Sequence, residues 1–298
     1  MQLIGLVGVG NVGSGFAKRL REAGHALTVY DRDRGKCDAA VALGARAADS
    51  PGKVADESDV ILLSLPGSHV VEAVMEGAEG VVSHLRAGHV VVDTGTSRPQ
   101  TAAHYERVCR EKGAGFIDAP ITGRNQGWIM MVGGAKDHFK TAREVLSCLS
   151  YRLKHVGSIG QGQVLKLMNQ LVLAGQWAVW GEAIAFMEKV GVEPRLLSEH
   201  LEFAVPEAMY GRDFTSSGTL ALHYKDLGYI LELAHDADAS IPLTSVVHEF
   251  FKGAKVAGKA DWWQAGVVEY WRKLNGGIGE SRMDADERGW PGSGDPAL

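Results

Sequence analysis

The sequence predicts an α/β N-terminal domain with a parallel-rich, doubly wound sheet, followed by an all-α C-terminal domain that a long interdomain helix joins to it. The first half alternates short β-branched runs with helical patterns, which is typical of a parallel sheet covered by helices on both faces. After about residue 157 the apolar residues recur with helical spacing, and no further strand is expected. We therefore expect the domains to span residues 1–160 and 161–275.

The expected strands of the first domain are apolar runs rich in β-branched residues, the composition of strands buried on both faces. Amphipathic helical patterns separate several of them, and Gly24 marks the end of the first helix. The strands are expected at 2–7, 25–30, 58–66, 88–95, 114–120 and 127–134, and the helices at 11–24, 97–113 and 135–149.

The second domain begins with one long, mostly apolar helical pattern from Gln163 to Val190. Polar residues interrupt this pattern, so a buried core helix is expected and a membrane span is not. Further helices are expected at 193–203, 219–237 and 242–258, and the aromatic cluster at 261–271 is expected to pack against the first domain or a partner subunit. Residues 276–298 are polar and rich in glycine and proline, which predicts a disordered tail.

The composition of the chain argues against several classes of protein, among them nucleic-acid-binding, membrane-binding and disulfide-rich secreted proteins. The chain of 298 residues has a formal net charge of -5 and no basic cluster, which argues against nucleic acid and anionic membranes as partners. Its 3 cysteines are far apart and fit no metal-ligand spacing, so a reducing cytoplasm is expected and a bound metal is not. The apolar start lacks a basic region and leads directly into a glycine motif, which indicates a first strand and not a signal peptide.

The glycine motif is "GVGNVG", from Gly8 to Gly13, between the first strand and the first helix. In this context Gly8 makes a tight turn, Gly10 lets a pyrophosphate approach the backbone, and Gly13 permits close helix–strand packing. The helix start, with Asn11 and Val12, offers backbone N–H groups to the phosphates. The pattern predicts a Rossmann domain that binds a dinucleotide.

Asp31 ends the second strand eighteen residues after Gly13. A carboxylate at this place binds both ribose hydroxyls and repels a 2′-phosphate, so NAD is favoured over NADP. The neighbouring Arg32 leaves NADP open, because a guanidinium beside the acid can accommodate the extra phosphate.

The stretch from residue 155 to 170 becomes apolar and helical after three glycines, and it contains one lysine, Lys166. An unpaired ammonium is unfavourable there, so the residue has either a structural or a functional role. The structural interpretation is a lysine whose stem packs while its charge reaches water, or one half of a buried ion pair. Asn169 and Gln170 follow at i+3 and i+4 and share its helix face, which is compatible with a polar site.

Five ordered motifs carry a resemblance to a known family. They are the glycine motif, Leu65-Pro66, "DTGTSRP", "DAPITGR", and the stretch from Gly157 through Lys166 and Asn169, with "KDL" at 225–227 as a further match. Over about residues 2–275 the chain resembles the β-hydroxyacid dehydrogenases, a family that includes 3-hydroxyisobutyrate dehydrogenase, tartronate semialdehyde reductase and the more distant 6-phosphogluconate dehydrogenase. It departs from the family pattern at Gly95, Thr122, Arg124 and Gln170.

The resemblance implies a site. Lys166 is implied as the catalytic acid/base, with a pKa lowered by burial and by the positive nicotinamide ring. Thr122 and Gly123 are implied to bind a substrate carboxylate, and Asn169 and Gln170 to contact the substrate. The remaining implied cofactor contacts are Leu65, Pro66, Thr96 and Lys225.

The substrate loop after Gly123 is shorter than is usual in the family and contains Arg124. Arginine binds planar or multiply oxygenated anions through several donors, so a second anionic group or a sulfonate on the substrate is one interpretation. A surface arginine that only solvates the loop is the other.

Three functions stay open. The first is an NAD-dependent dehydrogenase of a small 3-hydroxy acid, and the second is an aldehyde or semialdehyde reductase that uses NAD(P)H in the opposite direction. The third is a non-enzymatic cofactor-binding scaffold, which the retained Lys166 argues against. An imine reductase is disfavoured for the same reason, and the resemblance implies a homodimer or homotetramer.

Overall fold

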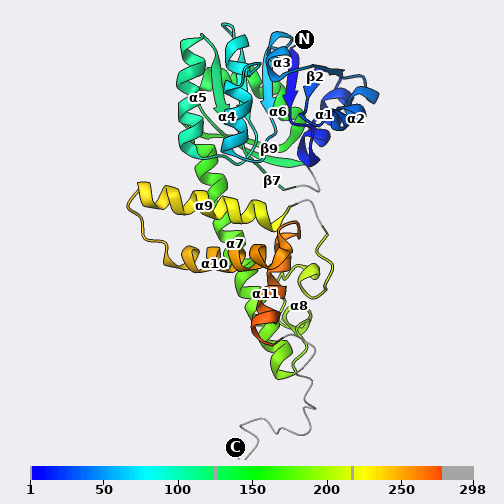
Figure 1. Cartoon of the computed structure of the whole chain (residues 1–298), viewed down its shortest axis with the longest axis vertical. Helices are drawn as coiled ribbons and strands as arrows, with labels where there is room; N and C mark the ends of the chain where they lie inside the picture. Colours follow the sequence, from blue (N-terminus) through cyan, green and yellow to red (C-terminus); the bar gives the residue numbers. More distant parts are fainter. Residues whose placement is uncertain (1, 124–126, 216–217, 277–298) are drawn as a thin grey trace, which may run out of the picture. The chain divides into compact units, whose positions relative to one another are not determined.

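The computed structural model describes residues 2–123, 127–215 and 218–276, which belong to two compact units, Met1–Asn169 and Gln170–Leu298 (Figure 1). The expected domain boundary at residue 160 falls at the start of helix α7 (Gln161–Val190), whereas the two units divide inside this helix. Arg124 and residues 277–298 of the expected tail lie outside the described residues.

The first unit is built on one sheet with the strand order β3-β2-β1-β4-β5-β6-β8-β7, and β9 also pairs with β8. The strands from β3 to β6 are parallel, β8 runs antiparallel to both β6 and β7, and β9 is parallel to β8. The bounds are β1 Leu3–Val7, β2 Ala26–Tyr30, β3 Arg46–Ala47, β4 Val60–Leu63, β5 Val90–Asp93, β6 Gly115–Asp118, β7 Ile121–Thr122, β8 Trp128–Gly133 and β9 Ser150–Gly157.

Helices cover both faces of this sheet, because successive side chains of each buried strand point to opposite faces. In β4, Leu62 belongs to a core with α1, α2 and α6, whereas Ile61 and Leu63 belong to a core with α3, α4 and α5. The doubly wound, parallel-rich sheet expected from the sequence is confirmed. The helices are α1 Asn11–Glu22, α2 Asp38–Ala42, α3 Pro51–Asp56, α4 Ser68–Glu76, α5 Pro99–Glu111 and α6 Lys136–Leu149, with 3₁₀ turns η1 Arg34–Cys37 and η2 Val81–His84.

The second unit is helical, as expected. Its elements after α7 are α8 Leu196–Glu199, η3 Glu207–Met209, α9 Leu220–Asp236, α10 Pro242–Ala254, the π-turn η4 Lys255–Lys259, η5 Gln264–Gly266 and α11 Val267–Leu274. Within this unit the buried Arg272 of α11 pairs with Glu188 of α7 at 2.7 Å and with Glu269 at 2.6 Å. Among the described residues, none of the helices combines the length and the apolar character that crossing a bilayer requires.

One local expectation, for a helix of the second domain, differs from the structure. The helix expected at 193–203 is reduced to α8, and Leu201 and Phe203 beyond it are 57% and 55% exposed, so burial does not stabilise a longer helix. The aromatic cluster at 261–271 makes contacts inside its own unit. Trp262 stacks on Phe214 with 5.0 Å between ring centroids, and Trp263 packs edge-to-face with Trp177 at 5.3 Å.

Candidate active site

The turn between β1 and α1 has backbone geometry that only glycine satisfies at two positions. Gly8 has a φ of 95°, and a Cβ there would lie 2.3 Å from the carbonyl oxygen of Ser64. A Cβ on Gly13 would lie 1.9 Å from the carbonyl oxygen of Gly8. These contacts support the roles expected for the two glycines, a tight turn and close helix–strand packing.

Gly10 has the opposite surroundings, because a Cβ on it would meet nothing within 4 Å. It is the N-cap residue of α1, and no side chain caps this helix start. The first turn, with Asn11 and Val12, therefore presents backbone N–H groups and the positive end of the helix dipole beside open space. The residues present fit the pyrophosphate of a dinucleotide.

Asp31 is tied to this turn. One carboxylate oxygen accepts a hydrogen bond from the backbone N–H of Val9 at 2.8 Å, and the other accepts from Asp33 N–H at 3.0 Å. A carboxylate oxygen can accept more than one hydrogen bond, so both oxygens of Asp31 keep capacity for ribose hydroxyls. Arg32 is exposed beside it.

The carboxyl ends of β4 and β5 meet the same turn. A Cβ on Gly95 would lie 2.4 Å from the carbonyl oxygen of Leu65, and a Cβ on Gly8 would lie 3.1 Å from the Leu65 side chain. The structure thus brings together the glycine turn, Leu65-Pro66 and the segment that contains Thr96. It also explains Gly95, because the neighbouring backbone leaves no room for the side chain usual in the family.

Lys166 lies in the first turns of α7 and is 7% exposed. Asn169 follows one turn later, and both belong to the first unit. Thr122 is in the short strand β7, which pairs with β8, and Gly123 follows it with a φ of 81°. Arg124 cannot be compared with its prediction, since it lies outside the described residues.

Three buried polar residues were not recognised from the sequence. Asp93, Asp118 and Gln163 are each 0% exposed, and Gln163 is three residues before Lys166. Burial raises the pKa of Asp118 to about 6, although the backbone N–H groups of Gly160 and Gln163 act in the opposite direction. The available signal was an aspartate at the end of each of two buried strands, together with a polar residue one turn before the lysine.

The other two predicted site residues belong to the second unit, where they share one carboxylate. Gln170 donates a hydrogen bond to Asp226 Oδ2 at 2.8 Å, and Lys225 Nζ is 3.0 Å from Asp226 Oδ1. Asp226 is 4% exposed, so its charge is compensated inside the unit.

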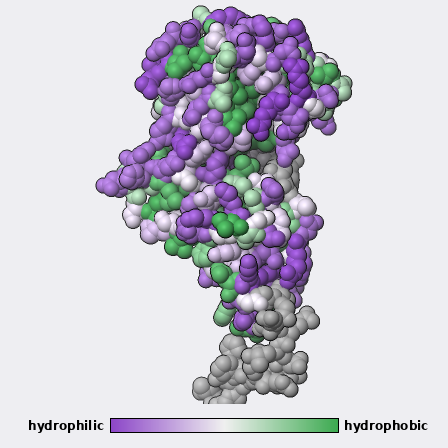
Figure 2. Space-filling model, in the orientation of Figure 1, coloured by the Kyte–Doolittle hydropathy of each residue, from purple (hydrophilic) through white to green (hydrophobic). Residues whose placement is uncertain are grey.

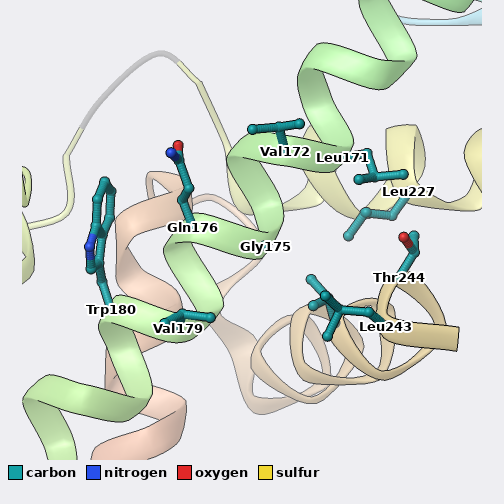
Figure 3. Close-up of a pocket in the computed structure, with 10 residues that line it drawn as sticks. Leu171, Val172, Gly175, Gln176, Val179, Trp180, Leu227, Leu243 and Thr244 are labelled. Atoms are coloured by element: carbon teal, nitrogen blue, oxygen red, sulfur yellow. The ribbon is translucent and has the colours of Figure 1, made fainter. Parts of the chain in front are cut away.

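An apolar pocket of about 390 Å³ lies elsewhere in the second unit (Figure 3). Among its lining residues Gln176 and Thr244 are polar, and none has an acid or base in its side chain. The lining therefore lacks the groups that proton transfer requires. The pocket is formed by Leu171, Val172, Gly175, Gln176, Val179 and Trp180 of α7, Leu227 of α9, and Leu243, Thr244 and Val247 of α10.

Two protein families match the chain. Residues 3–157 match the NAD binding domain of 6-phosphogluconate dehydrogenase, and residues 160–271 match the family described as NAD-binding of NADP-dependent 3-hydroxyisobutyrate dehydrogenase. The chain is 31% identical to 2-(hydroxymethyl)glutarate dehydrogenase of Eubacterium barkeri, with 92% of this chain and 96% of that protein covered. It is 29% identical to mitochondrial 3-hydroxyisobutyrate dehydrogenase of Homo sapiens, with coverages of 84% and 80%.

Solved structures agree with these matches. The Mycobacterium tuberculosis 3-hydroxyisobutyrate dehydrogenase, solved with L-serine, superposes with a TM-score of 0.81 at 26% identity, covering 91% of this chain and 99% of that one. The Salmonella typhimurium 3-hydroxyisobutyrate dehydrogenase has the same fold, with a TM-score of 0.81 at 22% identity and coverages of 90% and 99%. With both domain families matched in order and a relative aligned over nearly its whole length, the chain belongs to the β-hydroxyacid dehydrogenase family and is an NAD(P)-dependent oxidoreductase acting on a CH–OH group.

Proposed function

We propose that the protein interconverts a small 3-hydroxy acid and its carbonyl form with NAD, and that Lys166 is the acid/base. The observation that carries this proposal is that Lys166 is almost fully buried and belongs to the same unit as the glycine turn between β1 and α1. The nicotinamide supplies the hydride chemistry when it is bound. The protein's own task is to bind the substrate, orient it and move one proton.

Lys166 performs the proton transfer in this proposal. In the oxidation direction its neutral amine takes the proton of the substrate hydroxyl, and in the reduction direction its ammonium returns a proton to the forming alkoxide. Burial favours the neutral amine, which is the form that can accept a proton. The 7% exposure of Lys166 supports this role.

The substrate is proposed to bind to Thr122, Gly123, Asn169 and Gln170. Its carboxylate accepts hydrogen bonds from the Thr122 hydroxyl and from nearby backbone N–H groups in this proposal. The relatives support a hydroxy acid, since they are named for 2-(hydroxymethyl)glutarate and 3-hydroxyisobutyrate. The first is a dicarboxylate and the second a monocarboxylate. Arg124 is proposed to receive a second anionic group, so a substrate panel should include monocarboxylates, dicarboxylates and sulfonates of similar size.

The physiological direction is a separate question, because the same groups serve oxidation and reduction. A reductase of a semialdehyde or of a sulfonated aldehyde would use the same lysine and the same glycine turn. Rates in both directions, followed by NADH absorbance over the same panel, compare the two functions. A non-enzymatic scaffold would bind NAD and turn over none of these compounds.

The test of the proposal is substitution of Lys166. Lys166→Ala should lower kcat by roughly 10²–10⁴-fold, the range for loss of a general acid/base, while NAD affinity and the melting temperature change little. Lys166→Arg should not restore activity, because a guanidinium remains protonated and cannot accept a proton. The wild-type oxidation rate should rise with pH through an apparent pKa below the usual lysine value of about 10.4. A folded alanine variant with near-wild-type kcat would refute the role.

We also propose a homodimer or homotetramer that uses the helical unit. Val172, Val179 and Phe186 recur every seven residues on α7 and are 56%, 60% and 61% exposed. A seven-residue period places them along one side of the helix, the pattern that packs against another helix. Apolar residues are visible on the surface of this unit among polar ones (Figure 2).

A further inference from the structure

Two aspartates stand next to each other at the carboxyl edge of the sheet. Asp93 ends β5 and Asp118 ends β6, and the parallel register pairs them. Both are 0% exposed. Two neighbouring buried carboxylates are unfavourable unless donors compensate them, so their hydrogen-bond partners need an explanation.

The partners of Asp118 are at the start of α7. Its Oδ1 accepts a hydrogen bond from the backbone N–H of Gly160 at 2.7 Å, and its Oδ2 accepts from the N–H of Gln163 at 2.8 Å. The first N–H groups of a helix have no partner inside the helix, and a negative charge there is favoured by the helix dipole. A residue at the end of a strand thus serves as the N-terminal cap of α7.

Glycines let the first turn of α7 approach the sheet closely. A Cβ on Gly162 would lie 2.3 Å from the carbonyl oxygen of Met131 in β8, and a Cβ on Gly133 would lie 2.9 Å from the backbone nitrogen of Gly162. Backbone therefore lies against backbone at this point. The distance of the helix start from the sheet is fixed by these contacts and by the Asp118 cap.

Gln163 ties the first turn of α7 to the segment that follows β5. Its Oε1 accepts a hydrogen bond from the backbone N–H of Ser97 at 3.0 Å, and its Nε2 donates to the carbonyl oxygen of Gly95 at 2.9 Å. The same nitrogen is 3.4 Å from Asp93 Oδ2. The segment 95–97 contains Thr96, and Gln163 is 0% exposed, so this buried amide ties the helix directly to that segment.

We propose that Gln163 and Asp118 are positioning residues that hold Lys166 in register with the segment of Thr96 and with the segment that leads to Thr122. This inference rests on the proposed function of Lys166. Lys166 is one turn after Gln163 on the same helix, so a shift or rotation of the first turn moves its amine directly. A misplacement of about 1 Å in a reacting group can lower the rate about 10²-fold.

The test uses the full-length enzyme and Gln163→Met, which keeps the approximate size of the side chain and removes its hydrogen bonds. We expect kcat to fall roughly 10–100-fold, while KM for NAD stays within about twofold and the apparent pKa of the pH–rate profile shifts. Asp118→Asn is the second variant, because it keeps the shape and one acceptor oxygen and is expected to fold. It should lower kcat in the same way by a smaller factor.

Ser58→Ala is the matched control. Ser58 is also 0% exposed, and its hydroxyl donates a hydrogen bond to the carbonyl oxygen of Val54 at 2.6 Å. It precedes the amino end of β4, whereas the candidate site lies at the carboxyl ends of the strands. Its loss should lower the melting temperature without changing kcat or the pH profile. If folded Gln163→Met or Asp118→Asn behaves like this control, the positioning role is wrong.

A double variant separates this inference from the proposed function. In the Lys166→Ala background, Gln163→Met should cause no further loss of kcat, because its effect acts through the lysine. The same fold loss in both backgrounds would overturn the inference. An inactive Lys166→Ala with a fully active Gln163→Met would reject the positioning role alone, whereas an active Lys166→Ala would reject both.

Discussion

At the scale of single residues, Asp31 combines a structural task with a proposed specificity task. Its carboxylate holds the backbone N–H groups of Val9 and Asp33, so it fixes the glycine turn to the end of β2. The same negative charge lies where the ribose of the cofactor is expected. Arg32 is exposed next to it, and a guanidinium at this place favours tolerance of a 2′-phosphate.

The cofactor preference follows from this charge. We expect kcat/KM to be higher with NAD than with NADP, and Asp31→Asn to reduce the ratio roughly tenfold, which corresponds to about 1.4 kcal/mol. Asp33→Asn is the control, because it removes a charge two residues away whose carboxylate accepts from Gly35 N–H. An equal or higher wild-type value with NADP would contradict the assignment and point to Arg32 as a phosphate ligand.

At the scale of elements, the Asp118 carboxylate is one of the groups that hold the start of α7 at the end of β6. Burial raises the pKa of Asp118 from its ordinary value of 3.8 to about 6, so the folded protein takes up this proton at a higher pH than the unfolded chain does. The stabilisation from this protonation is therefore fully present below 3.8 and is lost as the pH rises through about 6.

This linkage gives a stability prediction. As the pH falls from 7 to about 4.5, the free energy of unfolding of the wild type should increase relative to that of Asp118→Asn, because only the wild type gains a proton at residue 118. Urea unfolding of both proteins across this range measures the difference. Carbon NMR of the Asp118 carboxyl gives the titration directly, and a midpoint near 3.8 would contradict the effect of burial.

At the scale of the whole molecule, the exposed apolar residues of α7 concern assembly. Val179→Glu and Phe186→Glu should shift the protein toward smaller species in light scattering coupled to size-exclusion chromatography, since a buried unpaired charge is unfavourable at an interface. Val256→Glu is the control, because Val256 is 80% exposed in η4 and is not part of the seven-residue pattern. A wild-type monomer, or oligomers unchanged by the α7 variants, would contradict the proposal.

The sequence by itself determined the features whose physical cause is local. The glycine motif from Gly8 to Gly13 and the helical period from Gln163 to Val190 are each visible in a short stretch of chain, because the pattern of neighbouring residues carries them. The strand–helix alternation and the family motifs are visible for the same reason. The predicted fold class and the family were confirmed, whereas the roles of the site residues stay predictions.

The tertiary structure decided the features that depend on strand order and burial. Strand β9 is polar and only partly buried, so its composition did not reveal it, and α8 is short because no apolar face covers it. Asp118 caps a helix 42 and 45 residues later, and Gln163 reaches back 66 and 68 residues to Ser97 and Gly95. Such partners are specified only when the sheet brings the ends of β5 and β6 beside α7, because hydrogen bonds act over a few ångströms in space and leave no periodic trace along the chain.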